Sequence, residues 1–203
     1  ITRDTPASEV PWANVEKDGR YLNEVIATGL WTRYGKVIQA PSWFLDALPP
    51  FPLDGELWMG VGSFQDLISA VKRLKPSDID WHDIRFMAFD MPPAISVLCD
   101  GTINNTNFRK TLAGCQQWYN DRCRVLQPKK FDFESAYHYL NHNSGGNGIW
   151  QPLTQTQLPF DTKKAQEMIT DQLLRVTEDG GEGLMLRKPS SIWTPGRTYD
   201  LLK

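Results

Sequence analysis

Leu53-Asp54-Gly55-Glu56-Leu57-Trp58 is the stretch of this sequence that decides the fold. Side chains alternate along a strand, so Asp54, Glu56 and Trp58 share one face, while Gly55 and the two leucines share the other. Burying a carboxylate is costly unless it is paired or bound to a cation, so Glu56 needs a partner. The stretch therefore predicts a strand that carries a functional carboxylate.

The segments around this strand predict further short strands and separate helices. Apolar residues recur at helical spacing after Ser63 and again after Asp161, and both residues suit a helix N-terminus. Strands and helices do not alternate regularly, which predicts an α+β fold class with two mainly antiparallel β-sheets flanked by helices. Besides the two helices just described, the expected helices are a short piece that begins at 41–42 and the segments 108–120 and 133–140. The expected strands are 53–58, 85–90, 124–126, 182–187, several short ones within 15–37 and the start of one at 199–203.

The composition is that of an ordinary globular chain. Its 203 residues are 40% hydrophobic, enough for one large or two small domains with a sizeable core. No apolar run approaches the length needed to cross a membrane, so we expect no membrane partner. The net charge of −2 provides no global basic field, so contact with nucleic acid requires a local patch.

The cysteines and the N-terminal stretch bear on the compartment. Cys99, Cys115 and Cys123 are odd in number and lack metal-ligand spacing, which favours buried thiols in a reducing compartment. The polar stretch 1–12 has no signal-peptide core. We expect an intracellular protein, with a periplasmic form that has lost its signal peptide as the alternative.

The segment Val15-Glu16-Lys17-Asp18-Gly19-Arg20 contains a candidate nucleophile. A free lysine amine, with a pKa of about 10.4, reacts only when burial or a nearby cation lowers that pKa. With its own acid, a glycine for close backbone approach and an arginine for an anion, Lys17 could form a covalent phosphoramide with a nucleotide. A solvated turn is the alternative, because Lys-Asp-Gly is a common tripeptide.

Polar groups on other predicted strands could share a pocket with this lysine. Glu56 and Glu182 are carboxylates inside otherwise apolar strands, so we expect both to be buried and to need a partner. Together they could hold Mg²⁺ on a nucleotide triphosphate, and Phe89 offers a flat face for a purine. The structural alternatives are a core position for Phe89 and an arginine partner for Glu56. We interpret Arg187 and Arg197 as salt-bridge partners outside the catalytic set. Three further cations could neutralise phosphates, namely Arg33, Lys188 and Lys203.

The order of these motifs resembles the lysine nucleotidyltransferases, and among them the small ATP-dependent DNA ligases of the bacterial and viral kind. The similarity spans nearly the whole chain, and six motifs in one order are far more specific than any one of them. The stretch from Pro41 through Trp58 and the segment 181–187 carry the strongest resemblance. In order, the motifs are Lys-Asp-Gly at 17–19, Thr-Arg-x-Gly at 32–35, Leu-Asp-Gly-Glu-Leu-Trp at 53–58, Phe-Met-Ala-Phe-Asp at 86–90, Glu-Gly-Leu-Met-Leu-Arg at 182–187 and Leu-Leu-Lys at 201–203.

The resemblance implies catalytic roles for three residues. Lys17 would attack the α-phosphate of ATP to form a lysyl-AMP intermediate, with Asp18 in support. Lys203 would grip the α-phosphate and aid adenylate transfer. Adenylate would then pass to a DNA 5′-phosphate, and a neighbouring 3′-hydroxyl would displace AMP and seal the nick.

The resemblance also implies an ATP-binding set. Phe89 would stack on adenine, Glu56 would contact the ribose, and Arg33 would touch the nucleotide sugar or the DNA end. Glu56 and Glu182 would be the metal-side carboxylates. The whole implied set is Glu16, Lys17, Arg20, Arg33, Glu56, Phe89, Glu182 and Lys203.

Cofactors, partners and domain organisation follow from the same resemblance. ATP and Mg²⁺ (or Mn²⁺) would be the cofactors and nicked double-stranded DNA the partner of a monomer that serves DNA repair, replication and recombination. Residues 1–203 would form one adenylation domain with the ATP-grasp-like fold of DNA ligases and mRNA-capping nucleotidyltransferases. We expect the C-terminal OB-fold domain of the family to be absent, because the chain stops at Lys203.

The nucleophile motif departs from the family pattern. The family reads Lys-x-Asp-Gly-x-Arg, whereas this chain reads Lys17-Asp18-Gly19-Arg20, which moves Asp18 to the strand face opposite Lys17. Residues missing from the sequence, a compensating strand distortion or a degenerate relative that no longer adenylates would each account for it. We favour missing residues, which an intact mass well above 23.2 kDa would support.

Two other functions stay open from the sequence. An RNA ligase or an mRNA-capping guanylyltransferase would use the same lysine chemistry. A non-catalytic nucleotide- or DNA-binding relative would explain the shortened Lys17-Asp18-Gly19-Arg20 motif.

Overall fold

The computed structural model describes residues 3–10, 13, 25–49, 51–92, 132–144, 148–194 and 196–203. The segment 15–20, the helix predicted at 108–120, the strand predicted at 124–126 and the three cysteines lie outside these residues.

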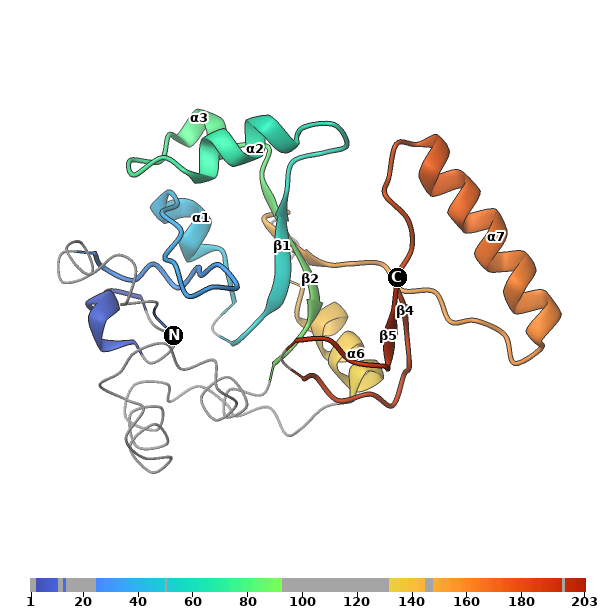
Figure 1. Cartoon of the computed structure of the whole chain (residues 1–203). Coiled ribbons are helices and arrows are strands. Elements are labelled where there is room, and N and C mark those ends of the chain that lie inside the picture. Colours follow the sequence, from blue (N-terminus) through green and yellow to red (C-terminus); the bar gives the residue numbers. More distant parts are fainter. Residues whose placement is uncertain are drawn as a thin grey trace, which may run out of the picture.

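A three-stranded sheet forms the centre of the described structure (Figure 1). It consists of β1 (Asp54–Trp58), β2 (Arg85–Asp90) and β3 (Trp150–Pro152), in the order β1-β2-β3. The sequence predicted β1 and β2 to within a residue but missed β3, which is short and ends in a proline. β1 and β2 are antiparallel, whereas β2 and β3 are parallel, so the expectation of mainly antiparallel sheets holds only in part.

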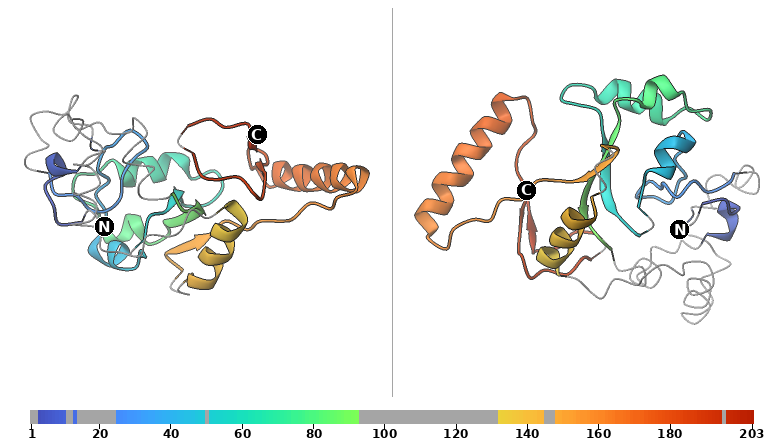
Figure 2. Two further views of the ribbon diagram at one scale, coloured as in Figure 1. Left: turned by 90° about the horizontal axis from the view of Figure 1, so that it is seen from below. Right: turned by 180° about the vertical axis from the view of Figure 1, so that it is seen from behind.

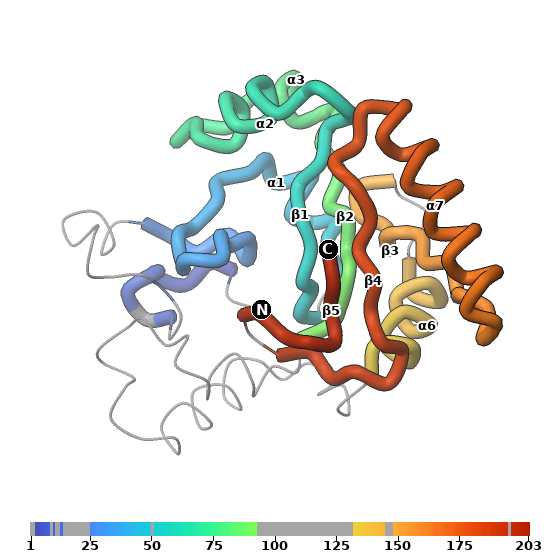
Figure 3. Tube along the Cα trace, turned by 45° about the vertical axis from the view of Figure 1, so that its right-hand side comes forward, coloured from blue at the N-terminus to red at the C-terminus, as the bar shows by residue number. Residues whose placement is uncertain are grey.

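A second, two-stranded sheet is formed near the C-terminus by β4 (Leu186–Arg187) and β5 (Leu201–Leu202), which are antiparallel. Figure 3 shows this sheet beside β1 and β2. The strand predicted over 182–187 is therefore much shorter than expected. Gly183 has a φ of +146°, a conformation that favours glycine and interrupts an extended strand.

Helices cover one face of the central sheet. They are α1 (Ser42–Asp46), α2 (Phe64–Val71), α3 (Asp78–Trp81) and α6 (Phe133–Asn143), preceded by a 3₁₀ turn, η1 (Ala7–Glu9). Phe44 and Trp81 meet edge to face, with ring centroids 4.8 Å apart, and Leu57 and Phe86 of the sheet pack against the same cluster. A second cluster joins β2, β3 and α6 and consists of Ala88, Met91, Ala136, Leu140 and Trp150.

Gly55 is required by the close approach of β1 to β2. A Cβ atom built at this position would lie 2.3 Å from the carbonyl oxygen of Met87 and 2.6 Å from the Phe86 ring. No side chain fits such contacts without a shift of the backbone. The glycine in the stretch 53–58 therefore fixes how tightly the two strands pair.

The register of β1 and β2 shifts beside Gly55. Gly55 lies opposite Ala88, while Asp54 lies opposite Asp90, so that Phe89 is the extra residue of a β-bulge. Bulges re-aim side chains, and this one brings two aspartates face to face at the end of the sheet.

The helix predicted after Asp161 is α7 (Thr162–Glu178), which projects from the rest of the chain in both views of Figure 2. The Asp161 side chain accepts a hydrogen bond from the backbone N–H of Lys164 at 3.0 Å, as expected for an N-cap. None of its residues is buried, and Leu173 and Leu174 are 42% and 56% exposed. The expected apolar face exists but is not covered within the described residues.

No helix in the described ranges has the length and apolar character that a bilayer crossing requires.

Candidate functional site

Glu56 lies on the face of β1 that the core does not cover. Its strand partner is Met87, while Leu57 and Phe86 point to the opposite, packed face. The Glu56 side chain is exposed and has neither a hydrogen bond nor an ion pair within the described part of the chain. The expectation of a buried carboxylate was therefore wrong, and the described residues provide no arginine partner for Glu56. As far as the described residues show, the exposed Glu56 carboxylate is open to a ligand.

Phe89 lies at the bulge in β2. It is half-buried, and neither of the two core clusters that the described residues form includes it, although its neighbours Ala88 and Asp90 are both buried. Phe89 and Glu56 belong to the same sheet, and they form what we call the adenosine side of the candidate site.

Glu182 and Lys203 lie close together near the second sheet. The carboxylate oxygen Oε2 of Glu182 is 3.6 Å from Nζ of Lys203. β4 and β5 pair Leu186 with Leu202, which brings Lys203 back toward the segment that precedes β4. The two side chains are 91% and 71% exposed, so the expected burial of Glu182 was also wrong. We call this pair the phosphate side of the candidate site.

Arg33 lies in a tight turn. A bridge between Trp31 and Val37 closes the turn, and the Arg33 guanidinium lies 5.1 Å from the centroid of the Tyr34 ring. Its side chain is exposed. The described structure shows no hydrogen bond or ion pair from Arg33 to the adenosine or phosphate side.

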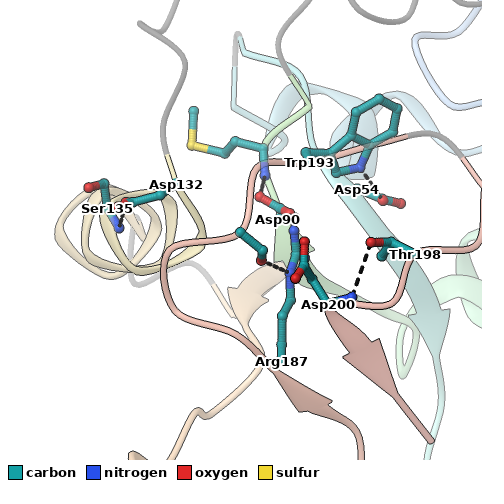
Figure 4. A network of polar contacts seen from close by, with 10 residues as sticks. Asp54, Asp90, Asp132, Ser135, Arg187, Trp193, Thr198 and Asp200 are labelled. Carbon is teal, nitrogen blue, oxygen red and sulfur yellow. Dashed lines mark hydrogen bonds and ion pairs between the residues drawn. The ribbon is translucent and has the colours of Figure 1, made fainter.

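Asp90 and Arg187 form a nearly buried ion pair between the two sheets (Figure 4). Asp90 Oδ2 is 2.5 Å from Arg187 Nη2, and the two side chains are 3% and 13% exposed. The other oxygen, Oδ1, accepts the backbone N–H of Met91 at 2.6 Å. Burial raises the pKa of Asp90 above its ordinary value, and the positive charge of Arg187 only partly opposes this. The interpretation of Arg187 as a salt-bridge partner is confirmed.

A second contact reaches the central sheet at β1, the strand next to the one that carries Asp90. The indole N–H of Trp193 donates to Asp54 Oδ2 at 2.7 Å (Figure 4). Asp54 and Asp90 lie opposite each other, so both cross-sheet contacts leave from the same end of the central sheet. Sequence reasoning expected a salt bridge from Arg187 but identified neither Asp90 as its partner nor the contact between Trp193 and Asp54. Their signal was a polar residue at each strand end, at 54 and 90, but nothing in the sequence pointed to Trp193.

The described residues contain no group of three or more His, Cys, Asp or Glu side chains that would hold a metal ion by themselves. Mg²⁺ is commonly held in proteins by one or two carboxylates together with substrate phosphates. The exposed carboxylates of Glu56 and Glu182 suit that mode.

The residues predicted for the nucleophile motif, Glu16, Lys17, Asp18 and Arg20, lie outside the described residues. The structure therefore brings Glu182 and Lys203 together and puts Glu56 and Phe89 on one sheet, and it leaves the position of Lys17 untested.

Comparisons with known proteins point to DNA ligases. No protein-family model matches the sequence. A DNA ligase from Haemophilus influenzae is 32% identical over 65 residues, which make up 32% of this chain and 24% of that protein.

Two solved structures extend the similarity. A chain from a structure-function study of Lig E DNA ligases that bind DNA with a minimal scaffold is 27% identical, with a TM-score of 0.58. The match covers 85% of this chain and 53% of that one. A chain named Pmar-Lig_PreS3 matches 85% of this chain with a TM-score of 0.56, and at 18% identity this likeness concerns the fold alone.

This chain spans about half of the Lig E structure, and its match to Pmar-Lig_PreS3 covers 36% of that chain. The sequence similarity, the structural neighbours and the mixed α+β architecture together support a DNA ligase-like domain.

Proposed function

We propose that this chain is the adenylation domain of an ATP-dependent DNA ligase. The observation that carries the proposal is the pairing of Glu182 with Lys203, an acid and a base that the family resemblance assigns to the metal and the phosphate. The chain that contains this pair is similar to a solved structure from a study of Lig E DNA ligases. Both side chains are exposed and are held by no other described ion pair. A triphosphate could therefore replace Glu182 as the partner of Lys203, and a metal ion could replace Lys203 as the partner of Glu182.

In the proposed reaction, the amine of Lys17 forms a bond to the α-phosphorus of ATP while the bond to pyrophosphate breaks. Lys203 would stabilise the negative charge that develops on the α-phosphate, and Arg33 would add a second positive charge. Phe89 would stack on the adenine, and base stacking of this kind tolerates any purine. The adenylate would pass to a DNA 5′-phosphate, and a 3′-hydroxyl would then displace AMP.

Glu56 and Glu182 are the carboxylates that would hold Mg²⁺ or Mn²⁺ with the nucleotide. The ion would supply charge neutralisation at the phosphates. Nicked double-stranded DNA would be the macromolecular partner, as the ligase neighbours suggest, and residues 1–203 would act as one domain in a monomer.

The test is incubation of the purified protein with α-³²P-ATP and Mg²⁺, followed by acid precipitation. We expect label on the wild-type protein and on Lys163→Ala, which removes an exposed lysine of α7, but none on Lys17→Ala. Wild-type protein without label, or label that survives Lys17→Ala, would contradict the proposal. Parallel incubations with labelled GTP and with nicked RNA separate a DNA ligase from an RNA ligase or a capping guanylyltransferase.

The shortened Lys17-Asp18-Gly19-Arg20 motif favours a second candidate, a nucleotide-binding relative that does not adenylate. Its signature would be thermal stabilisation by ATP together with an intact mass that never shows an AMP adduct. A mass increase equal to one adenylate would exclude it.

A further inference from the structure

The adenosine side and the phosphate side of the candidate site belong to different sheets. Glu56 and Phe89 lie on β1 and β2, whereas Glu182 and Lys203 flank β4 and β5. A ligand that contacts both sides requires a fixed separation of the two sheets. A displacement of about 1 Å at a reacting group can lower the reaction rate about 10²-fold.

The Asp90–Arg187 ion pair connects the two sides by a short path. Asp90 directly follows Phe89 in β2. Arg187 lies opposite Leu201 in the second sheet, and Leu201 precedes Lys203 by two residues. The ion pair therefore links the strand of the predicted adenine contact, Phe89, to the strand that precedes the predicted phosphate contact, Lys203.

The Arg187 guanidinium is held on three sides. Besides the pairing with Asp90, its Nε donates to Ser191 Oγ at 3.1 Å, and its Cζ lies 4.3 Å from the centroid of the Phe133 ring, at the start of α6. A planar guanidinium with stacking and two polar partners has little freedom to swing, and a lysine could not reproduce that geometry. These contacts hold Arg187 in place, and the backbone N–H of Met91 holds Asp90 on the central sheet.

The Trp193–Asp54 hydrogen bond repeats the arrangement on the neighbouring strand. Asp54 precedes Glu56 by two residues on β1, and Trp193 lies in the connection between β4 and β5. Each residue of the adenosine side is therefore close in sequence to an aspartate that is tied to the second sheet.

We propose that Asp90 and Arg187, assisted by Asp54 and Trp193, are positioning residues that hold the adenosine side and the phosphate side at the separation a nucleoside triphosphate requires. This inference rests on the proposed function, since it takes the nucleotide as the ligand. It adds that the pair acts through alignment, without touching the nucleotide.

The test compares the binding of ATP with that of adenosine by titration calorimetry. Wild-type protein should bind ATP more tightly than adenosine, because only ATP reaches the phosphate side. In Arg187→Gln, the affinity for adenosine should stay within about twofold of wild type, while the affinity for ATP should fall about tenfold and any labelling rate by up to about 10²-fold. Asp90→Asn should behave in the same way, and Arg187→Lys should restore part of the loss.

Arg175→Gln is the matched control. It breaks another Arg–Asp pair, in which Arg175 Nη2 lies 2.9 Å from Asp171 Oδ2 on the exposed surface of α7, and should leave both affinities unchanged. If Arg187→Gln does not fold, as judged by circular dichroism, Trp193→Phe carries the test, because it removes only the hydrogen bond to Asp54.

The outcomes separate the two proposals. An ATP preference that falls in the variants, with no label on the wild-type protein, would refute adenylation and support the positioning role. If the ratio of the affinity for ATP to the affinity for adenosine is the same in wild type and variants, the positioning role is overturned, even if the protein is labelled. A wild-type protein that binds ATP no more tightly than adenosine would overturn it as well.

Discussion

Asp54 and Asp90 lie directly opposite each other at one end of the central sheet, and each reaches a different partner in the C-terminal part of the chain. Two like charges in this position repel, and Asp54 adds to the burial that raises the pKa of Asp90. The arrangement persists because Trp193 and Arg187 supply one donor to each carboxylate. Several measurable properties depend on this end of the sheet.

The first prediction concerns the hydrogen bond between Trp193 and Asp54. Trp193→Phe keeps most of the apolar contact and removes the N–H donor, so the free energy of unfolding should fall by about 1.5–3 kcal/mol, as for a hydrogen bond to a charged group. Trp43→Phe is the matched control, because Trp43 donates to Asp78 at 2.9 Å in an exposed setting. Urea unfolding should show a smaller loss for the control. An equal loss would mean that the cross-sheet hydrogen bond contributes no more to stability than the exposed one.

The second prediction concerns Gly55. Gly55→Ala should destabilise the protein by about 1–3 kcal/mol or more, because the new Cβ would overlap the Met87 carbonyl and the Phe86 ring. Gly148→Ala tests backbone conformation alone, since Gly148 has a φ of +70° and no atom within 4 Å of a built Cβ. Thermal melts should rank Gly55→Ala as the more damaging change. The reverse order would contradict the close approach of the two strands.

The third prediction is a pH dependence. The folded-state pKa of Asp90 is raised above 3.8, so the folded protein binds more protons than the unfolded chain between these two pKa values. The contribution of Asp90 to stability is therefore fully present below pH 3.8 and is lost as the pH rises through the folded pKa. Asp90→Asn removes this loss, so the stability of the variant relative to wild type should increase with pH over that window. Urea unfolding at several pH values measures it, and a relative stability that falls with pH would reverse the sign.

The fourth prediction separates stability from activity at Lys203. Its pairing with Glu182 is exposed, and such pairs contribute about 0–1 kcal/mol, so Lys203→Met should leave the unfolding midpoint nearly unchanged. The rate of self-adenylation should fall by about 10²-fold, as expected when one charge that stabilises a transition state is removed. Lys163→Met, at an exposed position on α7, is the control. Unchanged adenylation in Lys203→Met would remove Lys203 from the catalytic set.

The fifth prediction concerns Phe89. Because Phe89 belongs to neither core cluster, Phe89→Ala should cost less stability than Phe86→Ala, which removes a side chain packed against both. The affinity for ATP should nevertheless fall, by about 1–3 kcal/mol for a lost base stack. Phe160→Ala, at a fully exposed phenylalanine before α7, should change neither quantity. ATP affinity that is insensitive to Phe89→Ala would assign the ring a structural role.

Local patterns predicted the elements that local physics controls. Alternation indicated β1, a mostly apolar run indicated β2, and an acidic N-cap with helical spacing indicated α7. The helix expected over 133–140 is α6, which extends three residues beyond Leu140. The parallel strand β3 was missed, because three residues ending in proline carry almost no strand signal. The burial of Glu56 and Glu182 was predicted wrongly, because alternation tells which residues share a face but not whether another layer covers that face.

The sequence by itself determined β1 and β2, the main helices and the likeness to DNA ligases, since these follow from residue patterns, capping and the order of short motifs. Only the tertiary structure decided that Asp54 and Asp90 meet at a bulge, that Arg187 and Trp193 reach them from the second sheet, and that Glu182 lies beside Lys203. The partners Asp54 and Trp193 are separated by 139 positions. Contacts between residues so far apart in the sequence arise from the packing of the chain, and no local pattern in one sequence encodes them.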